Sequence, residues 1–294
     1  MEIKSNPQNL KSAHGPPMRY RLLAIDIDGT LVNSRDEISP ATREALGRAR
    51  AAGIHVVLAT GRRYSKALPL VESLGIRVPL VTASGALVKD PCDHRTLFCA
   101  KFDRAVLCQA LRIIAGCGFD PVVCADTFLE GFDFYMARPE ARGPALAEYF
   151  SANRGDGRVW PGLLTCPPAG VFIGFSMGSR EEMLALAELL DRRLPNRLRL
   201  HVLRSPKYSG FLCEWTPAGV TKWSAVRRLA QGWGIDDGQI CAVGDDVNDI
   251  PMIQAAGLGV AMGNATAEVK AAADRLAPTL QEDGLATVVD WLLG

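Results

Sequence analysis

Short apolar runs alternate with amphipathic segments in the first ninety residues of the chain and again near its C-terminus. The runs cover residues 21–27, 54–59, 79–82, 239–243 and 258–261. Apolar runs of this length, without alternating polar positions, are typical of parallel strands that are buried on both faces. Between the first two runs, residues 40–52 show the spacing of an amphipathic helix. The pattern therefore predicts a doubly wound α/β core, in which helices cover both faces of a parallel sheet and the crossovers are right-handed.

The stretch from residue 92 to residue 213 does not continue this rhythm and is long enough to form a domain of its own. Its patterns predict helices over 104–117 and 180–194, and strands over 121–124, 170–175, 199–203 and 210–215. We therefore predict an α+β cap domain inserted into the core. The predicted boundaries are a disordered tail over 1–18, a core over 19–91 and 214–294, and the cap over 92–213.

The overall charge and the cysteine content exclude several classes of function. A formal net charge of +1 with 22% charged residues creates no basic field that would attract nucleic acid. No apolar run approaches the roughly 20 residues needed to cross a bilayer, and the segment before Met18 has no stretch typical of a signal peptide. The eight cysteines show neither C-x-x-C nor paired histidine spacing, which favours free thiols in a reducing cytoplasm over zinc ligands or disulfides. The sequence carries no signal of oligomeric state.

Two carboxylates lie one residue apart where the first apolar run ends. In Asp26-Ile27-Asp28-Gly29-Thr30 they would stand at the carboxyl end of a buried strand, the edge where open α/β sheets bind ligands. Mutual repulsion disfavours such a pair unless a cation lies between them, and ligands that are all oxygen favour Mg²⁺. Gly29 would let the backbone turn sharply and approach a phosphate. An Asp-Gly turn that merely closes a strand would explain Asp28 and Gly29, but not Asp26.

This motif resembles the opening signature of the haloacid dehalogenase superfamily, D-x-D-G-T-[LV], which residues 26–31 match in full. The resemblance implies a Rossmann-like α/β core and phosphoryl transfer through a covalent aspartyl-phosphate. It implies that Asp26 attacks phosphorus, and that Asp28 protonates the leaving oxygen and then activates water. Such an intermediate splits one difficult displacement into two easier steps. The resemblance also implies a bound Mg²⁺, with Asp26 and Asp28 among its ligands.

Two weaker motifs fit the same resemblance. Thr60-Gly61-Arg62 follows the second apolar run and resembles the second family motif, in which a hydroxyl binds the transferring phosphoryl group. That role falls to Thr60, with backbone N–H groups near Gly61 and the side chain of Arg62 as further substrate contacts. Lys222 matches the family lysine that neutralises charge on the nucleophile and on the phosphoryl oxygens. Taken alone, the ordinary alternatives are a helix N-cap for Thr60 and a solvated helix-start lysine for Lys222.

The fourth motif is the segment from Gly244 to Asp249, which directly follows the apolar run 239–243. It matches the family pattern G-D-x-x-N-D, which supplies acidic groups to the metal from a second loop. The resemblance implies that Asp245 ligates Mg²⁺, that Asp249 is a ligand or supports one, and that Asn248 contacts phosphate or the lysine. The alternative is a helix N-terminal turn whose carboxylates favour the dipole, and it leaves the matching order of four motifs unexplained.

The position of the insert and two late motifs resemble the Cof-type, or class IIB, sugar-phosphatase branch of this superfamily. That branch carries its α/β (C2-type) cap between the second and third motifs, which is where residues 92–213 lie. Gly263-Asn264-Ala265 and Glu282-Asp283-Gly284 look like its late signatures. Ser84-Gly85-Ala86 departs from its more usual Asn-Gly-Ala, which puts any contact normally made by that asparagine in question.

These features predict a Mg²⁺-dependent phosphatase that hydrolyses a small phosphorylated metabolite, such as a sugar phosphate, through a phosphoaspartate on Asp26. A phosphomutase of the same superfamily is the nearest alternative, because the sequence does not show whether water reaches the intermediate. A catalytically idle phosphate sensor is disfavoured, since it needs neither a nucleophile nor an acid. The cap should close over the core and exclude water. Near its return to the core, four candidates could contact a polar substrate: His201, Arg204, Lys207 and Tyr208.

Overall fold

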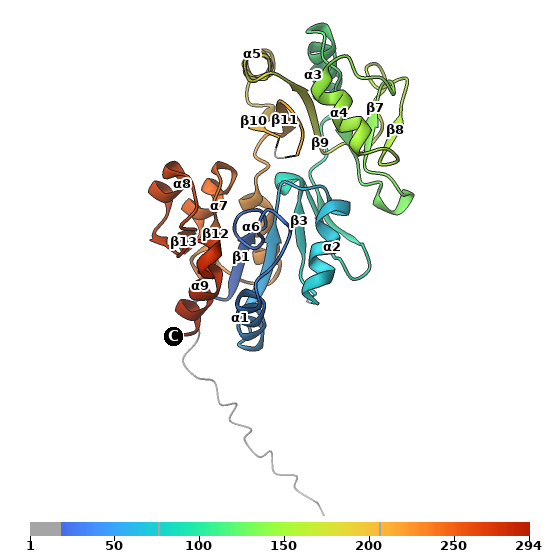
Figure 1. Cartoon of the computed structure of the whole chain (residues 1–294). Coiled ribbons are helices and arrows are strands. Elements are labelled where there is room, and N and C mark those ends of the chain that lie inside the picture. The colour runs from blue at the N-terminus through green and yellow to red at the C-terminus, as the bar shows by residue number, and fades with distance from the viewer. Residues whose placement is uncertain (1–18, 76, 206) are drawn as a thin grey trace, which may run out of the picture.

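The structure, a computed structural model, describes residues 19–75, 77–205 and 207–294. These residues form two lobes, with a mainly parallel sheet and its helices in one and a smaller, mainly antiparallel sheet in the other (Figure 1). The tail predicted over 1–18 lies outside the described residues. The predicted α/β class is confirmed.

The sheet of the larger lobe, hereafter the core, has eight strands among the described residues, in the order β14-β13-β12-β1-β2-β3-β4-β5. They are β1 (Leu22–Asp26), β2 (His55–Ala59), β3 (Leu80–Thr82), β4 (Leu87–Lys89), β5 (Thr96–Cys99), β12 (Ile240–Gly244), β13 (Leu258–Ala261) and β14 (Arg275–Leu276). Neighbours from β14 to β3 pair in parallel, and β4 and β5 add an antiparallel edge. The strand order reverses at β1, so the ends of β1, β2 and β12 surround the crevice in which such sheets bind ligands.

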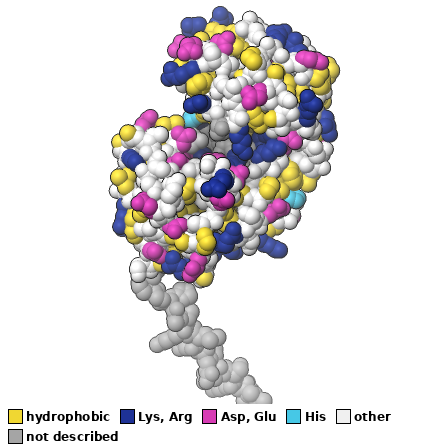
Figure 2. Space-filling model, in the orientation of Figure 1, with side chains coloured by type: hydrophobic (Ala, Val, Ile, Leu, Met, Phe, Trp, Pro, Cys, Tyr) yellow, Lys and Arg dark blue, Asp and Glu magenta, His cyan; other side chains and the backbone are white. Residues whose placement is uncertain are grey.

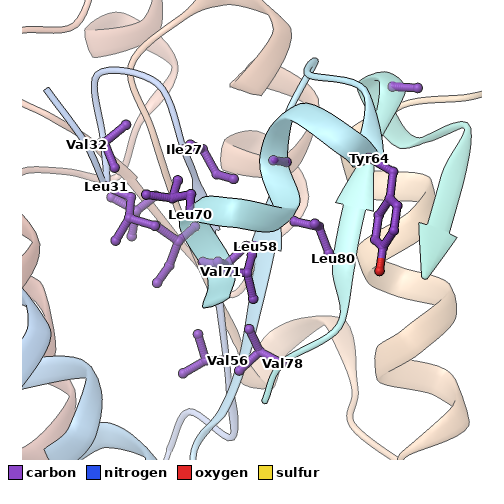
Figure 3. Close-up of a cluster of buried hydrophobic side chains, with 14 of the residues drawn as sticks. Ile27, Leu31, Val32, Val56, Leu58, Tyr64, Leu70, Val71, Val78 and Leu80 are labelled. Carbon is purple, nitrogen blue, oxygen red and sulfur yellow. The ribbon is translucent and has the colours of Figure 1, made fainter. Parts of the chain in front are cut away.

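Six α-helices of the described chain pack around the core sheet. They are α1 (Pro40–Ala51), α2 (Tyr64–Leu74), α6 (Lys222–Gly232), α7 (Ile250–Ala255), α8 (Ala267–Ala272) and α9 (Gly284–Leu293). Alternate side chains of β1 pack on the two opposite faces of the sheet. Leu23 and Ile25 belong to the apolar cluster beneath α1, α2 and α9, part of which Figure 3 shows, whereas Leu22 and Ala24 belong to the cluster beneath α6 and α7. Burial on both faces explains why the run is apolar throughout.

The smaller lobe, hereafter the cap, is built on a sheet in the order β10-β11-β9-β6-β7-β8. Its elements are α3 (Arg104–Gly116), β6 (Val122–Cys124), β7 (Phe134–Met136), α4 (Pro144–Ala152), β8 (Gly157–Val159), β9 (Ile173–Gly178), α5 (Arg180–Arg193), β10 (Leu198–Arg204) and β11 (Phe211–Pro217). Helices α3 and α5 cover one face over a cluster that includes the buried Trp215, and α4 packs against β9 on the other. Short 3-10 helices lie at Ala83–Gly85, Phe128–Glu130, Asp237–Gln239, Val247–Asp249 and Leu280–Glu282.

The five predicted core strands are present, and their ends differ from the prediction by no more than one residue. The cap contains elements that the pattern did not predict, namely α4, β7 and β8. Each of these two strands has three residues, too few for an alternation to be recognised. Strand β5 lies within the range predicted for the insert, yet it pairs with β4 in the core sheet. Three of the four residues of β5 are apolar, but β5 is an edge strand whose side chains are exposed or half-buried, unlike those of the central strands.

A group of polar side chains joins the two lobes, and we call Arg63, Ser65, Asp133, Asn153 and Asp156 the lobe clamp. Arg63, the residue before α2, donates to Asp133 and to Asn153, both at 2.7 Å, and to Asp156 at 3.3 Å. Ser65 donates to the same Asp133 carboxylate at 2.5 Å. The side chains of Arg63 and Asp133 are only 17% and 11% exposed. The clamp is therefore a largely buried ionic contact that fixes the cap against the start of α2.

Arg63→Ala is expected to lower the free energy of unfolding by about 3 kcal/mol, because it leaves the Asp133 carboxylate buried without a cation. Urea unfolding followed by circular dichroism measures this loss. The matched control is Arg193→Ala, which removes an exposed arginine at the end of α5 and should change stability by less than about 0.5 kcal/mol. Equal unfolding midpoints for the two variants would show that the clamp does not stabilise the fold.

Candidate active site

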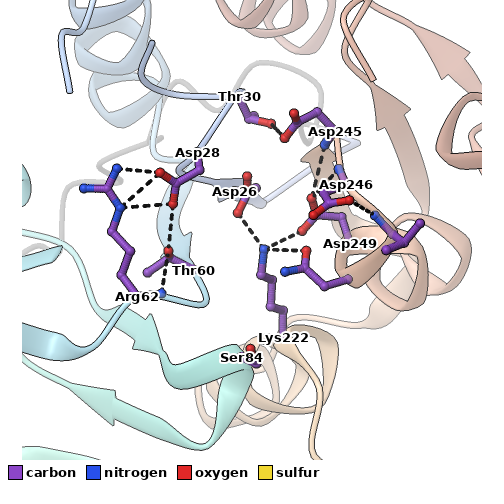
Figure 4. Close-up of polar contacts among 12 residues, drawn as sticks. Asp26, Asp28, Thr30, Thr60, Arg62, Ser84, Lys222, Asp245, Asp246 and Asp249 are labelled. Carbon is purple, nitrogen blue, oxygen red and sulfur yellow. Dashed lines mark hydrogen bonds and ion pairs between the residues drawn. The ribbon is translucent and has the colours of Figure 1, made fainter. Parts of the chain in front are cut away.

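The predicted site residues meet at the carboxyl edge of the core sheet, below the hollow between the lobes that Figure 2 shows. Asp26 is the last residue of β1, Thr60 directly follows β2, and Asp245 directly follows β12. Lys222 is the first residue of α6, whose N-cap Thr221 accepts a hydrogen bond from the N–H of the third helical residue. Parallel strands end on one edge, so residues far apart in the chain converge there (Figure 4).

Lys222 lies at the centre of the polar contacts. Its Nζ donates to Asp26 Oδ1 at 2.6 Å, to Asp249 Oδ1 at 2.8 Å and to Asn248 Oδ1 at 2.9 Å, so each N–H of the ammonium has a partner. Burial by itself lowers the pKa of a lysine, and this side chain is only 2% exposed. The carboxylates of Asp249 and Asp26 outweigh burial and hold the pKa of Lys222 above its ordinary value. Lys222 is therefore a permanent cation next to Asp26.

Three carboxylates form an acidic group beside Lys222. Asp26, Asp245 and Asp249 each bring one oxygen within 4.8 Å of the others. Burial, followed by the charge of Asp249, raises the pKa of Asp26 well above its usual range and raises the pKa of Asp245 to about 6. Within the described residues, Lys222 is the one cation that pairs with this group. The excess of negative charge and the all-oxygen donors suit a divalent metal ion.

Asp249 is held by contacts to both of its oxygens. Oδ1 accepts from Lys222, and Oδ2 accepts from the backbone N–H groups of Asp245 and Asp246, each at 3.1 Å. Its side chain is fully buried. Asp249 therefore fixes the loop after β12 and the position of Lys222 at the same time.

Hydrogen bonds from the loops that follow β1 and β13 hold the side chain of Asp245. Its Oδ1 accepts from Thr30 Oγ1 at 3.1 Å, and its Oδ2 accepts from Asn264 Nδ2 at 3.4 Å. Asn264 also donates to the backbone oxygen of Gly29 at 2.8 Å. Gly29 has a φ of +79°, and a Cβ on it would lie 2.1 Å from Asp245 Oδ2. A glycine is thus required for the two loops to approach each other.

The carboxylate of Asp28 points away from the acidic group and toward Arg62. Arg62 Nη2 donates to Asp28 Oδ1 at 2.5 Å, and Nε donates to Oδ2 at 3.0 Å. The same guanidinium pairs with Asp36, and these hydrogen bonds raise the pKa of Arg62 although burial opposes them. Thr60 Oγ1 lies 3.4 Å from Asp28 Oδ2. The sequence predicts a metal between Asp26 and Asp28. In this structure the Asp28 carboxylate pairs with Arg62, and the acidic group found among the described residues does not include its side chain.

Ser84, in the place of the usual asparagine, connects the core to the cap. Its Oγ donates to Glu214 Oε1 of β11 at 2.8 Å. Burial raises the pKa of Glu214, although the hydrogen bond from Ser84 opposes this. A Cβ on Gly61 would lie 3.6 Å from Ser84 Oγ, so Ser84 is close to the loop after β2.

The four residues predicted as substrate contacts occupy two places. His201 lines a hollow that also contains Lys222, whereas the other three line a second hollow at the end of β10. There Tyr208 accepts a hydrogen bond from Asn153 of the lobe clamp at 2.9 Å. Sequence reasoning missed the contacts of Arg63 and Glu214, for which no motif gave a signal. It noted Asn264 only as part of a late motif, without its contact to Asp245.

The chain matches the family model of haloacid dehalogenase-like hydrolases over residues 23–153 and 168–289. The chain belongs to this family. It is 31% identical to a putative phosphatase of Haemophilus influenzae and 29% identical to phosphatase YwpJ of Bacillus subtilis, and each alignment covers 93% of this chain and 98% or more of the relative. A haloacid dehalogenase-like hydrolase from Bacteroides thetaiotaomicron is 28% identical, with a TM-score of 0.74, and covers 93% of this chain and 99% of its own.

The Cof-type resemblance is confirmed by this family match and by the fold shared with the subclass IIB sugar phosphatase BT4131 (TM-score 0.72, 22% identity, 92% of this chain and 98% of that one). The protein is accordingly an enzyme that hydrolyses phosphoric monoesters. Among the helices of the described residues, none is long and apolar enough to span a bilayer.

Proposed function

We propose that the enzyme is a Mg²⁺-dependent phosphatase that hydrolyses a small phosphorylated metabolite, such as a sugar phosphate, through a phosphoaspartate on Asp26. The observation that carries this proposal is the contact of 2.6 Å between Lys222 Nζ and Asp26 Oδ1 beside the other buried carboxylates. A buried carboxylate held by a fixed cation is positioned to attack phosphorus, because the same cation offsets the charge of the phosphoryl oxygens. Eight cysteines without disulfides among the described residues support a place in the cytoplasm.

In the first step an oxygen of Asp26 bonds to phosphorus while the bond from phosphorus to the leaving oxygen breaks. Asp28 gives its proton to that oxygen. In the second step Asp28 takes a proton from water, the water oxygen bonds to phosphorus, and the bond to Asp26 breaks to release inorganic phosphate. Thr60, the N–H groups near Gly61 and Asn248 contact the phosphoryl oxygens.

Arg62 is placed to exchange partners when a substrate binds. Its Nη2 donates to Asp28 Oδ1 at 2.5 Å. A phosphoryl group that binds beside Thr60 competes with Asp28 for this guanidinium. Substrate binding would therefore release the Asp28 side chain from the ion pair.

Asp26 and Asp245 are the residues that we propose as direct Mg²⁺ ligands, with Asp249 as a ligand or a support. The donors fit the ion, since they are carboxylate oxygens whose charge Lys222 only partly offsets. Asp249 Oδ1 already pairs with the Lys222 ammonium, and its Oδ2 accepts from two backbone N–H groups. The oxygens of Asp245 accept only from a hydroxyl and a side-chain amide, and this difference favours the supporting role for Asp249. Ligation through the carboxylate of Asp28 requires it to leave Arg62, and this part of the predicted ligand set stays a prediction. The ion would supply charge stabilisation to the transferring phosphoryl group.

Added Mg²⁺ is expected to raise the melting temperature at about pH 7. At a hundredfold excess over its dissociation constant, the ion would raise the free energy of unfolding by about 2.7 kcal/mol. Protons compete for Asp26 and Asp245, whose pKa values are raised, so the shift should shrink as the pH falls through about 6. Without metal, Asp245 stabilises the fold below its unfolded pKa of 3.8, and this contribution is lost as the pH rises through about 6. Differential scanning fluorimetry measures both trends.

In the same experiment, Asp245→Asn should lose the Mg²⁺ shift. Asp237→Asn, in an exposed ion pair with Arg227, should keep it. A shift of the same size in both variants would remove Asp245 from the metal site.

Release of inorganic phosphate from p-nitrophenyl phosphate, with Mg²⁺ and with EDTA, tests the proposed function. Turnover that requires Mg²⁺ is expected, and no turnover under either condition would support the alternative of an idle phosphate sensor. Incubation with sugar phosphates tests the other alternative, since a phosphomutase would yield an isomerised sugar phosphate without stoichiometric free phosphate. A panel of phosphorylated metabolites then ranks the substrates by kcat/KM.

A further inference from the structure

A hollow between the cap and the core adjoins the candidate active site. Its lining includes Lys222 and Asn248 from the core, and Arg199, His201 and Glu214 from strands β10 and β11. Lys222 belongs to both, so the hollow lies next to the position of a phosphoryl group at Asp26. Its volume is only about 10 Å³ in this structure, so the leaving group of a substrate would contact these cap residues only after the cap moves away from the core.

The direction of the side chains on β10 follows from the alternation of a strand. Leu200 and Val202 pack into the apolar cluster beneath α3 and α5. Arg199 and His201, the alternate residues, project from the opposite face and line the hollow. The polar residues of this strand thus form a wall of the site rather than part of the outer surface.

Arg199 is a half-buried cation that forms no ion pair within the described residues. Its one hydrogen-bond contact is between Nη2 and His201 Nε2, at 3.3 Å. A guanidinium carries five N–H donors in a planar fork that matches a carboxylate or a phosphoryl group. Burial lowers the pKa of Arg199, as expected for a charge that lacks a close counter-ion. An anion in the hollow would relieve this cost.

Glu214, the acidic residue in the lining, attracts Arg199 through its charge but forms no ion pair with it among the described residues. Glu214 pairs across the strands with His201, and Arg199 pairs with Thr216, so Glu214 is diagonal to Arg199. The Oε1 of Glu214 accepts from Ser84 instead. Burial and Arg199 lower the pKa of His201, so the ring is neutral near pH 7 and can accept a hydrogen bond from Arg199. His201 thereby orients the guanidinium.

We propose that Arg199 is a specificity-determining residue that binds an anionic group, a carboxylate or a second phosphoryl group, on the leaving-group part of the substrate. This inference rests on the proposed phosphatase function. The substrate is then a small molecule with two anionic groups: one phosphoryl group is transferred to Asp26, and the other pairs with Arg199. A charge-assisted, bidentate contact of this kind contributes about tenfold or more to the preference for such a substrate.

Two matched pairs of substrates test this inference. 3-Phosphoglycerate and glycerol 3-phosphate differ by a carboxylate, and fructose 1,6-bisphosphate and fructose 6-phosphate differ by a phosphoryl group. The measured quantity is the ratio of kcat/KM within each pair. This ratio does not change with the fraction of active enzyme, so a partly misfolded variant still gives an answer. The pair with the larger ratio tells whether a carboxylate or a phosphoryl group is recognised.

The wild type is expected to favour the more anionic member of at least one pair by about tenfold or more. Arg199→Gln should reduce that ratio to about one, Arg199→Lys should retain part of it, and the exposed Arg193→Gln should leave it unchanged. A wild type without preference in either pair would overturn the inference, as would a ratio that Arg199→Gln leaves intact. Both results are distinct from failure of the proposed function, which would appear as no Mg²⁺-dependent turnover of p-nitrophenyl phosphate by the wild type.

Discussion

Asp26→Asn is expected to lower kcat for p-nitrophenyl phosphate by at least about 10³-fold, because an amide cannot attack phosphorus. The substitution keeps the shape of the side chain. It replaces a buried carboxyl group whose pKa is already raised by burial. We therefore expect a folded variant that has lost the chemical step. Phosphate release under Mg²⁺ saturation measures kcat, and circular dichroism confirms the fold.

Two further measurements make this result specific. Wild type quenched in acid during turnover should yield a phosphorylated peptide that contains Asp26, and the variant should yield none. Asp237→Asn, in an exposed ion pair at 3.0 Å from Arg227, is the matched control and should keep wild-type kcat. If Asp26→Asn turned over like the control, another residue would have to be the nucleophile.

Lys222→Met should affect both catalysis and stability. Removal of the cation that faces Asp26 should lower kcat by about 10²–10³-fold, since the charge that develops on the phosphoryl oxygens loses a fixed partner. Without metal at about pH 7, it should also lower the free energy of unfolding by about 3–5 kcal/mol, because Asp26 and Asp249 stay buried without their cation. Urea unfolding in EDTA measures this loss.

The pH dependence of this loss has a definite sign. Asp26 has a folded pKa above its ordinary value, and removal of Lys222 raises it further. A carboxyl group of this kind stabilises the fold when protonated, and that contribution is lost as the pH rises. The deficit of Lys222→Met should therefore be smaller at acidic pH than at about pH 7. The exposed Lys101→Met is the control, and a deficit equal to that of the control at both pH values would contradict the role of Lys222.

The convergence of the motif residues could be predicted because it depends only on the core sheet. Asp26, Thr60 and Asp245 each follow a buried strand whose apolar run is evident in the sequence, and neighbouring parallel strands must end at one edge. Lys222 joins them as the first residue of a helix that packs on the same sheet. Their catalytic roles stay predictions until the variants are measured.

The pairings between side chains could not be predicted in this way. Asp28 and Arg62 come from adjacent loops, but the choice of Asp28 between Arg62 and the acidic group depends on its side-chain direction. Ser84 and Glu214 are 130 positions apart and meet only because the cap lies over the core. A three-residue strand such as β7, or a helix such as α4 with a weak pattern, gives too little periodicity to place the cap elements that carry such contacts.

The lobe clamp sets a condition on how substrate range can be exchanged between relatives. A graft of the cap alone would import Asp133 into a host whose own residue before α2 need not be an arginine, and this carboxylate, only 11% exposed, would then be buried without a cation. Successful chimeras should therefore transplant the start of α2 together with the cap. The unit of recombination in this fold is then a pair of distant chain segments, not the contiguous insert that the sequence suggests.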